Sequence, residues 1–346
     1  MAGENSLYRA KIPAIADTQT RPIWSVMIPT YDCAEYLRRT LRSVLQQDLG
    51  SEVMQIEVID DCSTQDDPEA VVNELGKGRV SFYRQPQNVG YIKNFETCLL
   101  RSKGKLVHLL HGDDCVRSSF YQKMQSAFEK NPHLGAAFCR SIYIDEYGHW
   151  QSLSPLERNE SGILESWLEK IASGQRLTTP SIVVQREVYE NLGGFDRRFS
   201  CAGEDWEMWV RIATSYPVWF EVEPLALYRV KRAGSLTGES THKGRLVQDM
   251  RLATDIIESY LSTYLPQKTA NKLIQQARNT YANWAVETSR EMYIHGYFKN
   301  AIFQLNEAVK CNFSVRTFYQ VINLFLWQGL YLRTFNLLIN ARQIKP

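Results

Sequence analysis

The sequence lacks the features of a secreted, membrane-spanning or zinc-finger protein. No run of apolar residues reaches the roughly 18 that a transmembrane helix needs, and residues 1–21 contain no apolar core of a signal peptide. The seven cysteines are scattered and form no Cys-x-x-Cys pair, which argues against a disulfide framework and against a structural zinc site. We therefore expect a protein of the reducing cytoplasm.

An excess of charge of one sign is also missing. The 40 basic and 38 acidic residues leave a formal net charge of +2, which excludes the strong basic field of a non-specific nucleic-acid-binding protein. The distribution is uneven, because residues 241–346 contain 13 basic and 6 acidic residues. Hydrophobic residues make up 44% and charged residues 23% of the chain, as expected for a globular protein with a buried core.

The chain is long enough for one large domain or two ordinary ones. Residues 1–21 have no periodic pattern, and we expect a mobile leader there. Residues 22–235 are expected to form the first domain, and a run of small polar residues at 233–244 predicts a linker. Residues 245–346 are helical in pattern and predict a second domain, either a plain helical bundle or one that contains a single tetratricopeptide-like hairpin near 279–312.

Short apolar runs alternate with helical patterns in the first half of the chain. Strands are expected at 23–28, 55–59, 80–83 and 105–110, and helices at 33–47, 69–75 and 91–102. This alternation predicts an α/β fold with a mostly parallel sheet that helices cover on both faces. Such sheets bind ligands at the carboxyl ends of their strands, which is where Thr30, Asp32, Asp60, Asp61, Asp113 and Asp114 fall.

The first acidic turn, Asp113-Asp114, follows an expected strand. Two adjacent carboxylates repel each other unless a cation neutralises them, and a hard divalent ion with oxygen ligands would do so. The alternative is a capping pair for a helix that begins near Ser118.

Two further acidic turns have similar settings. A carboxylate at Asp60-Asp61 can accept a hydrogen bond from the imide N–H of uracil or thymine, or from the N1–H edge of guanine, although ordinary turn chemistry explains these residues equally well. Glu204 and Asp205 begin an expected helix at 204–214, where the backbone amides and the helix dipole stabilise a charged carboxylate. That carboxylate serves either as a helix cap or as a general base at the edge of a cleft.

Six blocks of sequence together resemble the family 2 glycosyltransferases, in the same order and at similar spacing over about residues 23–235. They are SVMIPTYD (25–32), EVIDDCST (57–64), NVGYIKN (88–94), LHGDD (110–114), GGFD (193–196) and GEDWEMW (203–209). The resemblance implies a GT-A fold, in which a Rossmann-like nucleotide-binding half is joined to an acceptor-binding half. It also implies an inverting transfer of a hexosyl group, as in enzymes that build bacterial surface polysaccharides.

The same resemblance implies roles for individual residues. The base of a UDP, dTDP or GDP sugar is expected to contact the turn after the first strand and the second acidic turn, at Pro29, Thr30, Tyr31, Asp32 and Asp61. Asp113 is expected to face the ribose or diphosphate, and Asp114 to bind Mn²⁺ or Mg²⁺. Asp205 is expected to take the proton from the acceptor hydroxyl, with Glu204 and Trp206 on the acceptor side.

Several positions depart from the usual pattern of the family. His111 stands where an aspartate is common, which leaves the Asp-x-Asp set incomplete, and Cys62 replaces a frequent glycine. Lys231 stands where a histidine is usual. A charged lysine cannot bind a metal but can pair with phosphate, so Lys231 or Arg232 is expected to stabilise the leaving group. Lys93 takes the place of an arginine near the base or phosphate.

Two other functions remain open from the sequence. A sugar nucleotidyltransferase shares the α/β nucleotide-binding domain, but the turn at 29–32 has no glycine of the kind that such enzymes carry in their phosphate loops. A non-catalytic helical interaction module on a transferase scaffold is the second alternative, and the presence of both Asp114 and Asp205 argues against it.

The basic residues after position 240 are interspersed with aromatic residues. They indicate either a helical core with a solvated basic face or a surface that contacts anionic lipid headgroups or a lipid-linked diphosphate. The expected partners are therefore a nucleoside-diphosphate sugar, a glycan or lipid-linked acceptor and an anionic membrane surface, but no nucleic acid. A location at the inner face of the cell membrane, as a peripheral protein, would suit them.

Overall fold

The computed structural model describes residues 6–16, 20–230, 240, 245–314, 317, 319, 321–324 and 326. The chain divides into two compact units. The first comprises Met1–Phe199 and Glu204–Ala233, and the second comprises Ser200–Gly203 and Gly234–Pro346. The linker expected at 233–244 lies outside the described residues except for Ser240.

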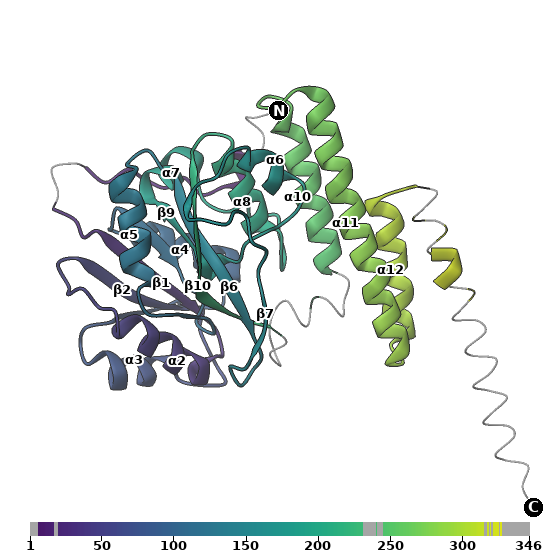
Figure 1. Ribbon diagram of the computed structural model, residues 1–346. Coiled ribbons are helices and arrows are strands. Elements are labelled where there is room, and N and C mark those ends of the chain that lie inside the picture. The colour runs from purple at the N-terminus through teal and green to yellow at the C-terminus, as the bar shows by residue number, and fades with distance from the viewer. Residues whose placement is uncertain are drawn as a thin grey trace, which may run out of the picture. The chain divides into compact units, whose positions relative to one another are not determined.

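The described strands belong to the first unit (Figure 1). They are β1 (Trp24–Thr30), β2 (Met54–Asp60), β3 (Ser81–Arg84), β4 (Leu106–Leu109), β5 (Cys115–Val116), β6 (Ala136–Ile144), β7 (Trp150–Leu153), β8 (Gly162–Ile163), β9 (Ile182–Gln185) and β10 (Val218–Arg229). Its helices are η1 (Ser6–Tyr8), α2 (Ala34–Leu45), α3 (Pro68–Gly76), α4 (Tyr91–Arg101), α5 (Phe120–Lys130), α6 (Trp167–Ala172), η2 (Thr179–Ser181), α7 (Arg186–Leu192) and α8 (Glu204–Ala213).

These strands form one mixed sheet in the order β3-β2-β1-β4-β9-β6-β10-β5, with β7 paired to β6 and β8 paired to β10. Strands β3, β2, β1 and β4 are parallel, so their carboxyl ends lie at one edge. Beyond them, β9 is antiparallel to both β4 and β6, whereas β6 and β10 are parallel. The predicted α/β class is confirmed, and the sheet departs from the parallel arrangement after β4.

Helices pack on both faces of the parallel part of the sheet. Trp24, Val26 and Ile28, which alternate along β1, belong to a core that they share with α2, α3 and α5. Helix α4 contacts β1 and β2, and its buried side chains do not belong to that core, so it covers the other face. The whole of β1 is buried, as expected for a central parallel strand.

The N-terminal segment 6–16 packs against the first unit, which corrects the expectation of a mobile leader for this part of residues 1–21. Ala10 and Ile12 are 5% and 2% exposed. Arg9 forms an antiparallel bridge with Asp196. The segment is held by a few apolar side chains and by pairing to a distant loop, and neither leaves a periodic pattern in the sequence.

The second unit is helical, with α10 (Arg245–Leu261), α11 (Gln267–Ile294) and α12 (Phe298–Cys311). Helices α11 and α12 form a hairpin around Gly296, which adopts φ +84°. In the same unit, Asp249 accepts hydrogen bonds from the backbone amides of Ser200, Cys201 and Ala202. Among the described residues, no helix is both long and apolar enough to cross a bilayer.

Candidate active site

The turns after β1, β2 and β4 are joined by backbone hydrogen bonds at the carboxyl edge of the sheet. The amide of Asp61 donates to the carbonyl of Thr30 over 2.9 Å, and the amide of Gly112 donates to that of Pro29 over 3.0 Å. The segments that carry the expected base-binding and metal-binding residues are therefore adjacent.

The turn after β1 is fixed by Asp32, which adopts φ +44°. Its carboxylate accepts the amides of Thr64 and Gln65 over 2.9 and 3.0 Å, so it connects this turn to the loop after β2. Pro29 and Thr30 are buried, whereas Tyr31 is 44% exposed. Of these four predicted nucleotide contacts, Tyr31 offers the largest accessible surface.

The two carboxylates after β2 have different partners. Asp60 is fully buried and forms an ion pair with Arg84 over 2.7 Å. We therefore assign it a structural role in the loop after β2. Asp61 is 3% exposed and accepts the amides of Val89 and Gly90 over 2.8 and 3.0 Å. Burial raises the pKa of Asp61, and these two amides oppose the shift. Each carboxylate oxygen of Asp61 keeps a second lone pair with which to accept a ligand N–H.

His111, Asp113 and Asp114 form a candidate metal site, because one ligand atom from each lies within 4.8 Å of the others. Asp114 is 1% exposed and accepts the amide of Arg229 over 2.8 Å. The ring of His111 stacks on the ring of Phe95, with 5.1 Å between the ring centres. Loss of solvation lowers the pKa of His111, which keeps the imidazole neutral and able to act as a ligand.

The donor set fits a divalent cation. The Nε2 atom of His111 is buried and has no hydrogen-bond partner among the described residues, and a buried nitrogen of this kind is costly unless it has a partner. Two carboxylates and one neutral imidazole supply two hard oxygen ligands and one nitrogen ligand. The sequence analysis noted His111 as a departure from the family and did not predict it as a ligand.

Asp205 lies in the first turn of α8, where its carboxylate accepts three hydrogen bonds. The donors are the amide of Trp206 over 2.7 Å, the side-chain amide of Gln175 over 2.6 Å and the hydroxyl of Thr179 over 3.3 Å. Burial raises the pKa of Asp205 to about 6, and these hydrogen bonds oppose the shift. The sequence analysis missed Gln175 and Thr179, which belong to an irregular segment without a recognisable pattern.

Tyr228 lies at the end of β10, next to Arg229, whose amide donates to Asp114. Burial raises the pKa of its hydroxyl group, and the negative charges of Asp114, Asp205 and Asp113 add to that effect. The sequence analysis did not assign a role to Tyr228, although Lys231 and Arg232, which it did single out, follow closely in the chain.

A side-chain hydrogen bond joins α8 to the first residue of α4, next to the turn whose amides Asp61 accepts. The hydroxyl of Tyr91 donates to Glu204 over 3.1 Å, and Tyr91 follows the Gly90 amide that Asp61 accepts. The elements that carry Asp61 and Asp205 are thus in contact with each other through Tyr91 and Glu204.

The remaining predicted residues lie as follows. Glu204 is 6% exposed, and Lys93 is exposed in the first turn of α4. Trp206 is completely buried and its indole N–H donates to the carbonyl of Ile171 over 2.7 Å, so the expectation of an acceptor contact there is wrong: the ring belongs to the core. Lys231 and Arg232 lie outside the described residues.

A hollow of about 640 Å³ lies at the opposite end of the parallel strands. Its lining includes Pro22, Gln55 and Ser81, near the first residues of β1, β2 and β3, and contains none of the carboxylates described above. We therefore place the chemistry at the carboxyl edge of the sheet.

Comparison with known proteins identifies the family and the fold. Residues 25–193 match the family model described as Glycosyl transferase family 2. An uncharacterised glycosyltransferase of Mycoplasma genitalium is 25% identical over 260 residues, which cover 70% of this chain and 82% of that protein.

The fold is shared with solved structures at low sequence identity. TarS 1–349 of S. aureus in complex with UDP-GlcNAc is 14% identical with a TM-score of 0.64, and the match covers 83% of this chain and 81% of that one. The mannosyltransferase PcManGT of Pyrobaculum calidifontis, in complex with GDP-Man and Mn²⁺, is 18% identical with a TM-score of 0.53, covering 90% and 92%. With this family match and a GT-A sheet flanked by helices, residues 25–193 of the chain belong to the family 2 glycosyltransferases.

Proposed function

We propose that the protein is an inverting, metal-dependent transferase that moves a sugar from a nucleoside diphosphate to a hydroxyl group of a glycan or lipid-linked acceptor. The observation that carries the proposal is the cluster of His111, Asp113 and Asp114 at the carboxyl edge of the sheet, whose ligand atoms lie within 4.8 Å of one another. A metal-binding pair and a carboxylate base must both reach one sugar diphosphate in such a reaction.

The donor nucleotide binds at the turns after β1 and β2. Tyr31 provides the exposed part of the first turn beside the half-buried Asp32, and Asp61 accepts the N–H of a uracil, thymine or guanine base. The neighbouring structures with UDP-GlcNAc and GDP-Man support a base that carries this donor. Lys93, Lys231 and Arg232 supply positive charge to the diphosphate.

Asp114, with Asp113 and His111, would hold a divalent cation, either Mn²⁺ or Mg²⁺. When bound there, such a cation would supply positive charge to offset the charge that develops on the departing diphosphate. The imidazole nitrogen favours Mn²⁺, because Mg²⁺ prefers oxygen ligands in near-ideal octahedral geometry.

Asp205 takes the proton of the acceptor hydroxyl as the acceptor oxygen attacks the anomeric carbon on the face opposite the diphosphate. The bond between the anomeric carbon and the diphosphate oxygen breaks as the new glycosidic bond forms, and the configuration at that carbon is inverted. The hydrogen bonds from Gln175 and Thr179 fix the direction of the Asp205 carboxylate. With a pKa of about 6, this group is mostly ionised at neutral pH and can act as a base.

A screen of nucleoside diphosphates by thermal shift, with and without Mn²⁺ or Mg²⁺, tests the donor site. We expect one of UDP, dTDP and GDP to raise the melting temperature more than CDP or ADP, and the metal to increase the shift. Equal shifts for all bases would contradict the role of Asp61. Product analysis with sugar nucleotides then separates the alternatives, since glycosyl transfer releases a nucleoside diphosphate and nucleotidyl transfer releases pyrophosphate.

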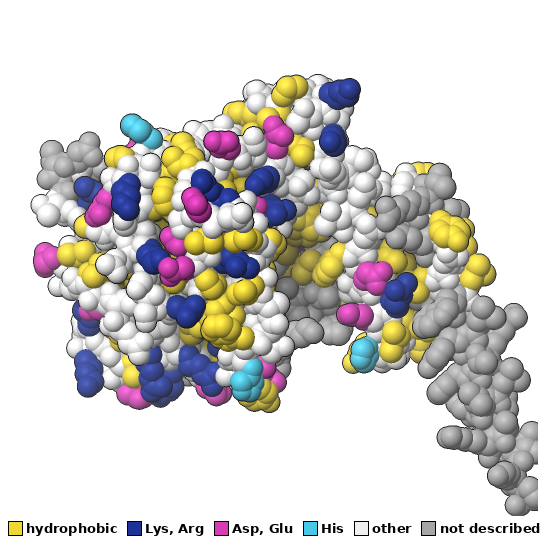
Figure 2. Space-filling view, in the orientation of Figure 1, with side chains coloured by type: hydrophobic (Ala, Val, Ile, Leu, Met, Phe, Trp, Pro, Cys, Tyr) yellow, Lys and Arg dark blue, Asp and Glu magenta, His cyan; other side chains and the backbone are white. Residues whose placement is uncertain are grey.

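The helical region 245–346 contacts an anionic membrane surface in this proposal, while residues 22–235 carry the transferase. Support comes from the excess of basic residues after position 240 and from large apolar side chains that reach the surface of this region, including Tyr297, Phe298, Ile302 and Phe303; Figure 2 shows hydrophobic atoms on its visible face. Sedimentation with vesicles is the test: binding to anionic but not to neutral vesicles is expected, and equal binding or none overturns this part.

A further inference from the structure

Backbone hydrogen bonds pair the N-terminal segment with residues 193–198, which precede α8 and Asp205 in the chain. The amide of Gly194 donates to the carbonyl of Ala10 over 2.8 Å, and the amide of Arg197 donates to that of Tyr8 over 2.9 Å. The guanidinium of Arg198 lies 4.3 Å from the centre of the Tyr8 ring. Two backbone hydrogen bonds and one contact between a cation and an aromatic ring therefore fix the segment to residues 193–198.

Gly193 allows this close approach. It adopts φ +79°, and a Cβ atom there would lie 3.2 Å from the carbonyl oxygen of Ala10. Any other residue at this position would be strained and would press on the N-terminal segment.

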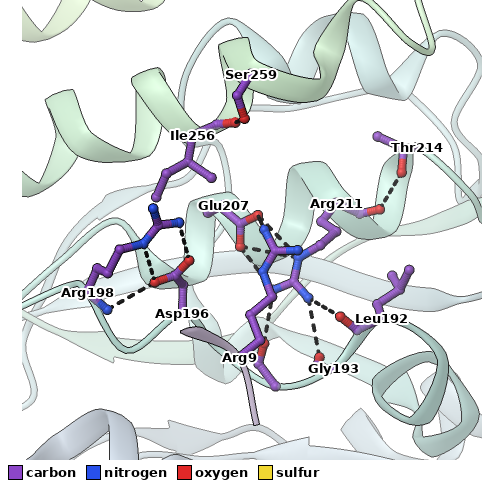
Figure 3. A network of polar contacts seen from close by, with 11 residues as sticks. Arg9, Leu192, Gly193, Asp196, Arg198, Glu207, Arg211, Thr214, Ile256 and Ser259 are labelled. Atoms are coloured by element: carbon purple, nitrogen blue, oxygen red, sulfur yellow. Dashed lines mark hydrogen bonds and ion pairs between the residues drawn. The ribbon is translucent and has the colours of Figure 1, made fainter. Parts of the chain in front are cut away.

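Between these two backbone pairs, Arg9 reaches into α8 (Figure 3). Its guanidinium donates to Glu207 over 2.8 Å, with side chains that are 11% and 0% exposed. Arg211 pairs with the same carboxylate over 3.0 Å and also donates to the carbonyls of Leu192 and Gly194. Glu207 thus lies between one arginine of its own helix and one from nearly 200 residues earlier in the chain.

Glu207 and Asp205 point to different sides of α8. Successive residues of an α-helix are about 100° apart, so residues separated by two positions are about 200° apart. One side of the first turn therefore presents Asp205 to Gln175 and Thr179, and the other side buries Glu207 against Arg9. A rotation or shift of this turn moves both carboxylates together.

We propose that Arg9 is a positioning residue for glycosyl transfer, which holds the first turn of α8 through Glu207 and thereby keeps Asp205 directed at the acceptor. The proposal rests on the proposed role of Asp205 as the base. In this proposal Arg9 acts through Glu207 and not through contact with either substrate. Its loss leaves a fully buried carboxylate with less neutralising charge, which costs more than the loss of an exposed ion pair.

Steady-state kinetics of Arg9→Gln test this role. We expect kcat to fall about tenfold while KM for the nucleotide sugar stays within twofold, because small displacements of a catalytic group are costly and Arg9 is paired with α8, which carries the base. Arg9→Lys should recover most of the loss. Arg38→Gln, which removes an exposed ion pair with Glu74 at a similar 2.7 Å, is the matched control and should have wild-type kinetics. A kcat of Arg9→Gln within twofold of wild type overturns the proposal.

A double-mutant cycle and hydrogen exchange complete the test. If Arg9 acts through Glu207, the combined variant Arg9→Gln/Glu207→Gln loses less activity than the product of the two single losses, and strict additivity would contradict the proposal. Faster amide exchange over residues 204–208 in Arg9→Gln is expected even if no donor is turned over. Unchanged exchange therefore overturns the positioning role, whereas an active Asp205→Asn variant overturns the proposed base.

Discussion

At Asp205, burial and hydrogen bonding act in opposite directions on one carboxyl group. Loss of solvation raises its pKa to about 6, while donors from Trp206, Gln175 and Thr179 stabilise the charged form. The result is a group that changes charge close to neutral pH, which suits a general base better than an unperturbed aspartate.

The pH dependence of kcat follows from this shift. Below about pH 6 the carboxyl group of Asp205 is protonated and cannot accept the acceptor proton, so kcat should rise with pH through about 6 and then level off. Asp205→Asn should lower kcat about 10²–10⁴-fold and remove this acid limb. A flat profile between pH 5 and 8 in the wild type would contradict the assignment.

The stability of the same variant separates catalysis from folding. A carboxyl group whose folded pKa lies above its unfolded value binds its proton more tightly in the folded state, so its contribution to stability grows as the pH falls from about 6 towards 4. Above pH 6 the ionised group destabilises the fold. The melting temperature of Asp205→Asn at pH 7.5 should therefore equal or exceed that of the wild type, and a marked decrease would point to a structural role.

His111 offers a second test at the residue scale. Because its neutral imidazole lies with Asp113 and Asp114, His111→Ala should weaken Mn²⁺ binding about tenfold or more, a loss of at least about 1.4 kcal/mol. A titration followed by the electron paramagnetic resonance signal of unbound Mn²⁺ measures this. His133→Ala, at an exposed histidine, is the control and should bind Mn²⁺ as the wild type does. Equal affinities for both variants would remove His111 from the ligand set.

Among the elements, the turn after β4 depends on a close approach to the turn after β1. A Cβ atom on Gly112 would lie 2.9 Å from the hydroxyl of Thr30 and 3.1 Å from the sulfur of Cys33. These short, buried side chains have little room to move, so the two turns must separate if the glycine is replaced.

Gly112→Ala should therefore lower stability by about 1–3 kcal/mol and reduce kcat, because Asp113 and Asp114 follow this glycine directly. Urea unfolding and steady-state kinetics measure the two effects. Gly50→Ala is the control: it places alanine at φ +90° in open space before β2, so it should cost stability without a change in kcat. A loss of kcat in both variants would mean that activity merely follows stability.

The sequence predicted elements well where local periodicity and parallel pairing agree. The strands and helices from β1 to β4 lie within a few residues of their expected positions. The apolar runs of β1, β2 and β4 are buried in the sheet, whereas β3 lies at its edge and is partly exposed. The pairing of β9 between β4 and β6 was not predictable, because it joins segments far apart in the chain. Likewise, the position of Trp206 next to Asp205 in the sequence does not reveal that its ring faces the core. No sequence pattern predicts that Arg9 pairs with Glu207.

Across the whole molecule, the cysteines differ mainly in accessibility. Six of the seven are buried, and Cys62, at φ +63° next to Asp61, is partly exposed. A thiol reagent should therefore label one cysteine in the native protein and seven in denaturant, and Cys62→Ser should abolish the native label.

Protection of Cys62 by nucleotide extends this measurement to the donor site. If the base binds at Asp61, the preferred nucleoside diphosphate should slow the labelling of Cys62, and inorganic phosphate at the same concentration should not. Labelling at an unchanged rate under saturating nucleotide would place the base elsewhere.

The antiparallel strand β9 also sets an order of events on the ribosome. Strands β1 to β4 emerge first and can pair among themselves, but the outer edge of β4 has no partner until Gln185 has been synthesised. During that interval the nascent chain exposes the unpaired N–H and C=O groups of β4, and such groups favour association with other chains. Chaperone dependence during translation should therefore be greatest before residue 185 has left the exit tunnel.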